Sequence, residues 1–278
     1  MPHDPIVLVP PMLCDLGVFG PQMLDLAKDH AVMFAPTTQG ERMEEIASQI
    51  LTWAPAKFAL AGMGMGGMVA LEILRRAPQR VTRIALIATS AQAETPETAA
   101  ARESRIIAAK GGGRWHEVVQ HEINSTWMAP TTDRVALVRH LRQMAEALGP
   151  AAYVSQSRAM QRRKDQQSTL SQIKQPAFVI CGRHDGQYPV KRQEFMAELI
   201  PYATLEVIED AGYVHARSAG SGDGGAAALD DSAAAAAAVG QAAAFLLAGL
   251  AVSPELASMK SSTRGRIFCR QLRPAKIP

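Results

Sequence analysis

The stretch FALAGMGMGGMVALEILRRAP, residues 58–78, constrains the fold of this chain more than any other. It begins with a short apolar run over 58–61, passes through closely spaced glycines, and continues with apolar residues at helical spacing over 65–76. A buried strand that turns directly into an amphipathic helix is typical of a parallel sheet, because parallel strands need a crossover connection. The stretch therefore predicts an α/β fold.

The same alternation extends over most of the chain. Short apolar runs predict further strands over 6–9, 31–35, 81–88, 177–181 and 205–209, and helical spacing predicts helices over 18–28, 41–53 and 189–199. This order predicts a mostly parallel central sheet with helices on both faces.

One long insertion interrupts the alternation. Residues 91–172 contain helical patterns, clearest over 131–148, and no convincing strand. We therefore expect core segments over 1–90 and 173–212, a helical cap over 91–172, and an atypical segment over 213–278.

Composition narrows the class of protein. The 278 residues are enough for one large α/β domain with an insertion, and 47% hydrophobic with 20% charged residues allows a packed core. The net charge of +3 is small and scattered, which argues against dedicated nucleic-acid binding. The three cysteines lie far apart, so neither a disulfide framework nor a metal site is indicated.

Nothing in the sequence predicts a membrane protein. The N-terminus lacks the basic and apolar regions of a signal peptide. The longest apolar run, 233–251, is mostly alanine and is broken by Gly240, Gln241 and Gly249, whereas a membrane span needs about 20 strongly apolar residues. We expect a cytoplasmic protein.

The glycines of the 58–78 stretch allow several interpretations. Close packing of a helix on a strand would explain Gly62, Gly64 and Gly66. A dinucleotide fingerprint would use Gly62, Gly64 and Gly67, but no acidic residue follows about 20 positions later at the end of a second strand.

A third interpretation rests on the order of the elements. Over residues 5–212 the chain resembles the α/β-hydrolase family, in which such a strand–turn–helix carries Gly-x-Ser-x-Gly, the nucleophile elbow. This chain reads Gly62-Met63-Gly64-Met65-Gly66, so Gly64 stands at the nucleophile position.

Two other segments carry the resemblance. Pro10-Pro11-Met12-Leu13 is similar to the family's oxyanion loop, which implies that the backbone N–H groups of Met12 and Met65 hold an oxyanion. Asp185, between a strand and a helix, matches the acid that orients a catalytic histidine. The alternative for Asp185 is a helix N-cap near Pro189.

The chain departs from the family at two catalytic positions. Gly64 replaces the serine, and glycine adopts the positive φ of the elbow without strain, so the fold should survive while the chemistry is lost. The family's histidine follows a glycine after the last strand, but here Gly212 precedes Tyr213, and His215 comes two residues late.

The amino-acid sequence after Gly212 has an unusual composition. Residues 219–243 are almost only Ala, Gly, Asp and Ser. When residues 213–230 are back-translated and read one nucleotide later, the permitted codons allow the sequence TSTLEAPDRVTAALLRWM. A histidine placed between Gly212 and this sequence would restore the family's Gly-His pair. We hypothesise a frameshifted C-terminus, which the encoding DNA tests; a natural alanine-rich linker is the alternative.

The resemblance implies a small apolar acyl or ester ligand. Leu13 and Trp127 are candidate binding residues, and Trp115, Met128 and Tyr153 could extend an apolar wall. Nothing indicates a metal, flavin or nucleotide cofactor. Three functions stay open: an ester-hydrolase scaffold without activity, a non-catalytic binding protein, and non-hydrolytic chemistry by His215 and Asp185 with the oxyanion hole.

Overall fold

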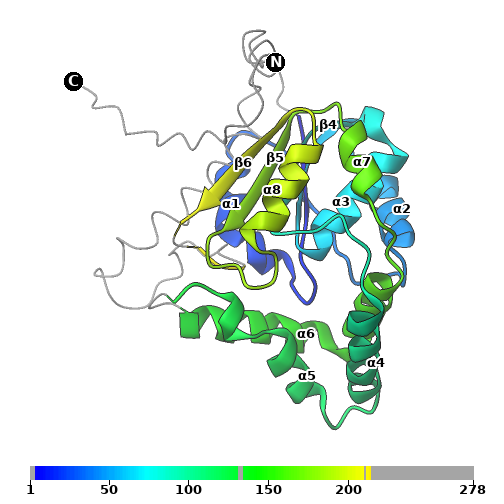
Figure 1. Ribbon diagram of the computed structural model, residues 1–278, viewed down its shortest axis with the longest axis vertical. Coiled ribbons are helices and arrows are strands. Elements are labelled where there is room, and N and C mark those ends of the chain that lie inside the picture. The colour runs from blue at the N-terminus through cyan, green and yellow to red at the C-terminus, as the bar shows by residue number, and fades with distance from the viewer. Residues whose placement is uncertain (1–3, 131–133, 210, 214–278) are drawn as a thin grey trace, which may run out of the picture. The chain divides into compact units, whose positions relative to one another are not determined.

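A parallel sheet of six strands forms the centre of the molecule (Figure 1). The computed structural model describes residues 4–130, 134–209 and 211–213. The strand order is β2-β1-β3-β4-β5-β6, and every neighbouring pair is parallel. The strands are β1 (Ile6–Val9), β2 (Val32–Phe34), β3 (Phe58–Met63), β4 (Val81–Ile87), β5 (Ala177–Gly182) and β6 (Ala203–Ile208). The predicted α/β fold is confirmed.

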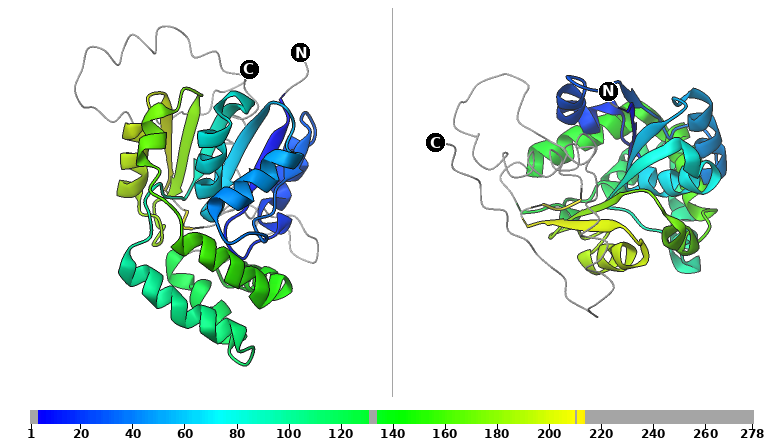
Figure 2. Two further views of the ribbon diagram at one scale, coloured as in Figure 1. Left: turned by 90° about the vertical axis from the view of Figure 1, so that its right-hand side faces the viewer. Right: turned by 90° about the horizontal axis from the view of Figure 1, so that it is seen from above.

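Burial explains why the strands read as continuous apolar runs. All residues of β1, β3 and β5 are buried, since helices cover both faces of the sheet. One core cluster packs the sheet against α2 (Met43–Trp53), α3 (Met65–Arg76), α7 (Gln167–Gln172) and α8 (Val190–Leu199). The other packs the sheet against α1 (Gly20–Leu26) and helices inserted between β4 and β5. Figures 1 and 2 draw these helices around the sheet.

The insertion between β4 and β5 is helical in the part that the structure describes. Its helices are α4 (Pro96–Lys110), α5 (Trp115–Glu122), α6 (Arg134–Gln161) and α7. In Figure 1 the strand arrows point towards α4–α6, so these three helices lie at the carboxyl ends of the strands. α7 contacts α3 and α8 instead and belongs to the helical layer over the sheet.

The described part of the helix predicted over 131–148 ends where its pattern indicated, because the next residue, Gly149, is not helical. α6 runs to Gln161 and bends at Gly149, which has φ 77°, and is followed by Pro150. Proline in a helix removes a backbone hydrogen bond, so two helical segments meet at a kink there.

Within the described ranges, none of the helices is both long enough and apolar enough to cross a membrane. The expected atypical segment 213–278, apart from Tyr213, lies outside the described residues.

Candidate active site

Gly64 forms the sharp turn between β3 and α3. Its backbone has φ 53° and ψ −119°, a conformation that glycine adopts more readily than other residues. The turn is held on both sides, because the Gly64 N–H donates to Ile87 O at 3.0 Å and Thr89 Oγ1 donates to Gly64 O at 2.6 Å. The strand–turn–helix predicted from the sequence is therefore present, with glycine at its apex.

The flanking glycines have a packing role. A Cβ atom on Gly66 would overlap the carbonyl oxygen of Val9 in β1, and one on Gly62 would overlap the carbonyl of Gly66. Both contacts are with backbone that cannot move aside. Close helix–strand packing thus explains Gly62 and Gly66, while Gly64 faces mainly side chains.

Tyr213 occupies the space where a side chain at position 64 would stand. Its hydroxyl lies 2.5 Å from the position of a Cβ on Gly64. The Tyr213 N–H donates to Trp127 O at 2.8 Å, and the ring packs on Tyr188 with centroids 5.6 Å apart. Burial raises the pKa of the Tyr213 phenol well above its ordinary value, so the hydroxyl stays protonated at neutral pH.

Asp185 is a buried carboxyl with one unused oxygen. Oδ1 accepts the N–H groups of Gln187 at 2.8 Å and Tyr188 at 2.7 Å, whereas Oδ2 has no hydrogen-bond partner among the described residues. Burial raises its pKa to about 6, against the opposing effect of the two backbone bonds. α8 begins at Val190 with Pro189 as its N-cap, so Asp185 does not cap it. In a catalytic triad, such a carboxylate oxygen accepts a hydrogen bond from a histidine N–H.

The predicted oxyanion loop lies beside the elbow. Met65 is the first residue of α3, so its N–H has no acceptor within the helix. Leu13 has φ 60°, and its N–H donates to Gln156 Oε1 of the cap at 3.0 Å. Gln156 also donates to Thr37 Oγ1 at 3.0 Å and is fully buried. Sequence analysis missed Gln156, because its partners lie more than 100 residues away in the chain.

A small cavity lies between the predicted oxyanion loop, Met65, Tyr213 and residues of the insertion. Its volume is about 50 Å³, about a third of the ~150 Å³ of a cavity that holds benzene. Five predicted residues line it together, Met12, Leu13, Met65, Trp127 and Met128. It is lined further by Cys14, Arg102, Glu122, Ile123, Leu141, Met160, Gln187, Tyr188 and Tyr213.

Two of the expected wall residues lie elsewhere. Trp115 and Tyr153 pack on each other in the cap, with ring centroids 5.7 Å apart, and do not line the cavity. His215 lies outside the described residues.

Asp185 should make the protein less stable as the pH rises. Its folded pKa of about 6 exceeds the unfolded value of ~3.9, so the stabilisation is complete below about pH 4 and is lost as the pH rises through 6. A shift of about two pKa units corresponds to about 3 kcal/mol. Urea unfolding of the unaltered chain and of Asp185→Asn, between about pH 4 and 7.5, measures this.

The other carboxyl groups are the same in both proteins, so their contribution to the pH dependence cancels in the comparison. The free energy of unfolding of the unaltered chain, minus that of the variant, should fall by about 3 kcal/mol across the range. A difference that does not change with pH would show that the carboxyl is ionised in the folded state without penalty.

Known proteins share this architecture. The family model described as serine aminopeptidase, S33 matches residues 43–218. A pimeloyl-[acyl-carrier protein] methyl ester esterase of Aromatoleum aromaticum is 28% identical over 185 residues, which cover 63% of this chain and 74% of that protein. One from Aliivibrio fischeri is 23% identical, covering 61% and 68%.

Solved structures agree on the fold. A thermophilic esterase from Thermogutta terrifontis superposes with a TM-score of 0.66 and 24% identity, covering 76% of this chain and 83% of that one. The enol-lactonase from Burkholderia xenovorans also gives 0.66, with 22% identity and coverage of 77% and 85%.

Proposed function

Since the chain belongs to the serine aminopeptidase S33 family of α/β-hydrolases, we propose that it is an ester-hydrolase scaffold of this family that does not hydrolyse esters in its present sequence. The observation that carries the proposal is the pairing of Gly64 with Tyr213, whose hydroxyl fills the space of the missing nucleophile. Loss of the triad serine costs about a million-fold in turnover, or about 8 kcal/mol of barrier.

The proposed ligand is a small carboxylic ester or acyl compound. The relatives are named as methyl ester esterases, which favours a methyl ester of an acyl chain. The largely apolar lining of the elbow cavity supports this class. We also propose that the protein acts without a cofactor and is located in the cytoplasm.

A second function is binding without catalysis on the same fold. The retained cavity beside the elbow favours it, because catalytic groups can be lost while an apolar wall and its polar groups stay in place. Non-hydrolytic chemistry would require His215, which lies outside the described residues, so no contact supports it.

The unaltered chain should be inert towards reagents that detect an activated serine. We expect hydrolysis of p-nitrophenyl acetate and butyrate at the buffer rate, and no stoichiometric labelling by a fluorophosphonate, because position 64 offers no hydroxyl. Rate measurement and intact-protein mass spectrometry check both. Turnover well above buffer, with a single labelled residue, would show that another nucleophile serves the site and would reject the proposal.

A further inference from the structure

The cavity at the elbow has a charged wall. Arg102 of α4 and Glu122 of α5 line it, although most of the other lining residues are apolar. The Arg102 side chain is 8% exposed and that of Glu122 12%. Charged groups buried to this degree cost several kcal/mol unless they are paired, so their partners decide what each can still bind.

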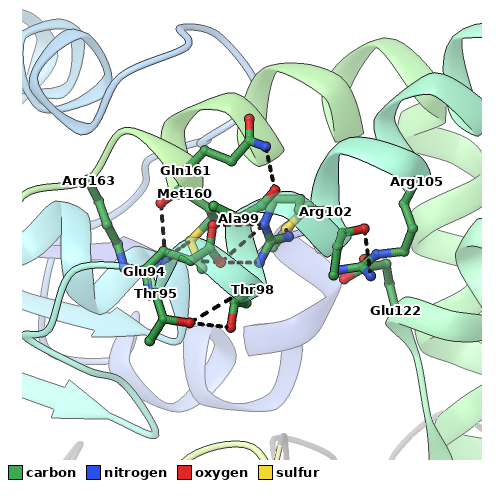
Figure 3. Close-up of polar contacts among 12 residues, drawn as sticks. Glu94, Thr95, Thr98, Ala99, Arg102, Arg105, Glu122, Met160, Gln161 and Arg163 are labelled. Carbon is green, nitrogen blue, oxygen red and sulfur yellow. Dashed lines mark hydrogen bonds and ion pairs between the residues drawn. The ribbon is translucent and has the colours of Figure 1, made fainter.

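Glu122 is bound on the cap side through one of its two carboxylate oxygens. It accepts Arg105 Nε at 2.7 Å and the hydroxyl of Tyr153 at 2.9 Å, both at Oε1. Figure 3 shows Arg105 and Glu122 together, apart from the contacts of Arg102. The Glu122 carboxylate thus pairs with Arg105, but its charge also acts on Arg102. Burial lowers the pKa of the Arg102 guanidinium, and the hydrogen bond to Glu94 and the charge of Glu122 raise it above its ordinary value.

Arg102 keeps unused hydrogen-bond donors. Its Nε and Nη2 donate to Glu94 at 3.2 and 2.8 Å (Figure 3). Among the described residues, Nη1 meets only the thioether sulfur of Met12 at 3.9 Å, and a thioether is a weak acceptor. Met12 lines the same cavity and is the predicted oxyanion residue. A strong acceptor inside the cavity would therefore improve the hydrogen bonding of Arg102.

The carboxylate of Glu94 forms ion pairs with two arginines, Arg102 and Arg163. Arg163 Nη1 lies 3.4 Å from the same oxygen, Glu94 Oε1. The cluster therefore holds three arginines and two glutamates, Arg102, Arg105, Arg163, Glu94 and Glu122, an excess of one positive charge. The carboxyl of Asp185 does not line the cavity, and burial raises its pKa to about 6 against the opposing charge of Arg192.

We propose that Arg102 is the anion-binding group of this cavity, and that its ligands are acyl compounds with a free carboxylate close to the oxyanion loop. Charge-assisted hydrogen bonds to a buried guanidinium are the strong ones, and a carboxylate matches the planar donors of arginine. The inference rests on the proposed function for the ester group of the substrate. With the added carboxylate, the substrate class becomes half-esters of dicarboxylic acids. Binding of the carboxylate itself does not depend on ester hydrolysis.

Small isosteric probes test the proposal on the full chain. Propionate and propionamide have nearly the same shape, but only propionate carries a charge. We expect the unaltered chain to bind propionate about tenfold more tightly, or more, as measured by NMR titration with shifts at Met12, Cys14 and Met65. Arg102→Gln should abolish the preference.

Arg163→Gln is the matched control. It removes a guanidinium from the same Glu94, but Arg163 does not line the cavity, so the preference for propionate should persist. Arg102→Lys retains the charge and should keep part of the preference for propionate. This variant replaces Arg102→Gln as the test if Arg102→Gln does not fold.

Three results would overturn the proposal: equal affinities in the unaltered chain, a preference that survives Arg102→Gln, or an equal loss in Arg163→Gln. Ester turnover by the unaltered chain would instead contradict the proposed function and leave these affinities as they are. The two failures can therefore be told apart.

Discussion

The double variant Gly64→Ser with Tyr213→His should hydrolyse p-nitrophenyl esters at least about a thousandfold faster than the unaltered chain, whereas Gly64→Ser alone should stay near the buffer rate. The double variant places a serine at the elbow and a histidine directly after Gly212. Position 213 is close enough to Asp185 for its charge to act on Tyr213, and Asp185 Oδ2 has no hydrogen-bond partner among the described residues. It thereby supplies a nucleophile, a base and an orienting acid together.

The single variant lacks both room and a base. The Cβ of a serine introduced at position 64 would lie 2.5 Å from the Tyr213 hydroxyl in the present arrangement, so the phenol would have to move. Even then, the buried phenol, whose pKa is raised, cannot take the serine proton at neutral pH. Tyr213→His with Gly64 retained is the matched control and should also be inactive.

Initial rates from about pH 5 to 9 provide a second measurement. In the double variant the rate should rise through an apparent pKa near ~6.5, the ordinary value of histidine. If Gly64→Ser alone reached the rate of the double variant, another base would have to serve the site, and His215 would become the first candidate. A folded but inactive double variant would favour the binding function.

Gly66→Ala should have the largest effect on stability, lowering the free energy of unfolding by about 4 kcal/mol or more. The added methyl group would overlap the carbonyl oxygen of Val9, in a strand that pairs with a neighbour on each side. The strand of Val9 cannot withdraw without breaking hydrogen bonds of the sheet, so α3 would have to move away from β1 and lose its packing there. Urea unfolding followed by circular dichroism measures the change.

Gly113→Ala is the control for this substitution. A Cβ atom there has no neighbour within 4 Å, so the change should be within about 0.5 kcal/mol. A Gly66→Ala protein as stable as Gly113→Ala would mean that α3 can move away from β1 at little cost.

The local pattern of the sequence predicted the central sheet well, because buried parallel strands are short apolar runs wherever they occur. The 58–61 run is extended to Met63 in the structure, since the two residues before the turn also pair with β4. The end of the helical pattern at residue 148 is also confirmed, because Gly149 is non-helical; the second helical segment of α6, over 150–161, was not given a range of its own.

The site was predictable only where it follows the order of elements. Met12, Leu13, Met65 and Trp127 do line one cavity. The contact between Tyr213 and Gly64, and the polar wall at Arg102, depend on how the cap and the last loop pack at the carboxyl ends of the strands. No local periodicity encodes such contacts, because the partners lie about 90 to 150 residues apart.

The hydrogen bonds of Gln156 bear on how this protein can be recombined with its relatives. The side chain joins helix α6 to two core loops, at Leu13 and Thr37, entirely out of solvent. A cap transplanted from a relative without an amide at this position would leave both groups buried and unsatisfied, at about 1–3 kcal/mol each. The insertion is therefore not an exchangeable module: chimaeras must carry the residue at position 156 together with the loops that follow β1 and β2.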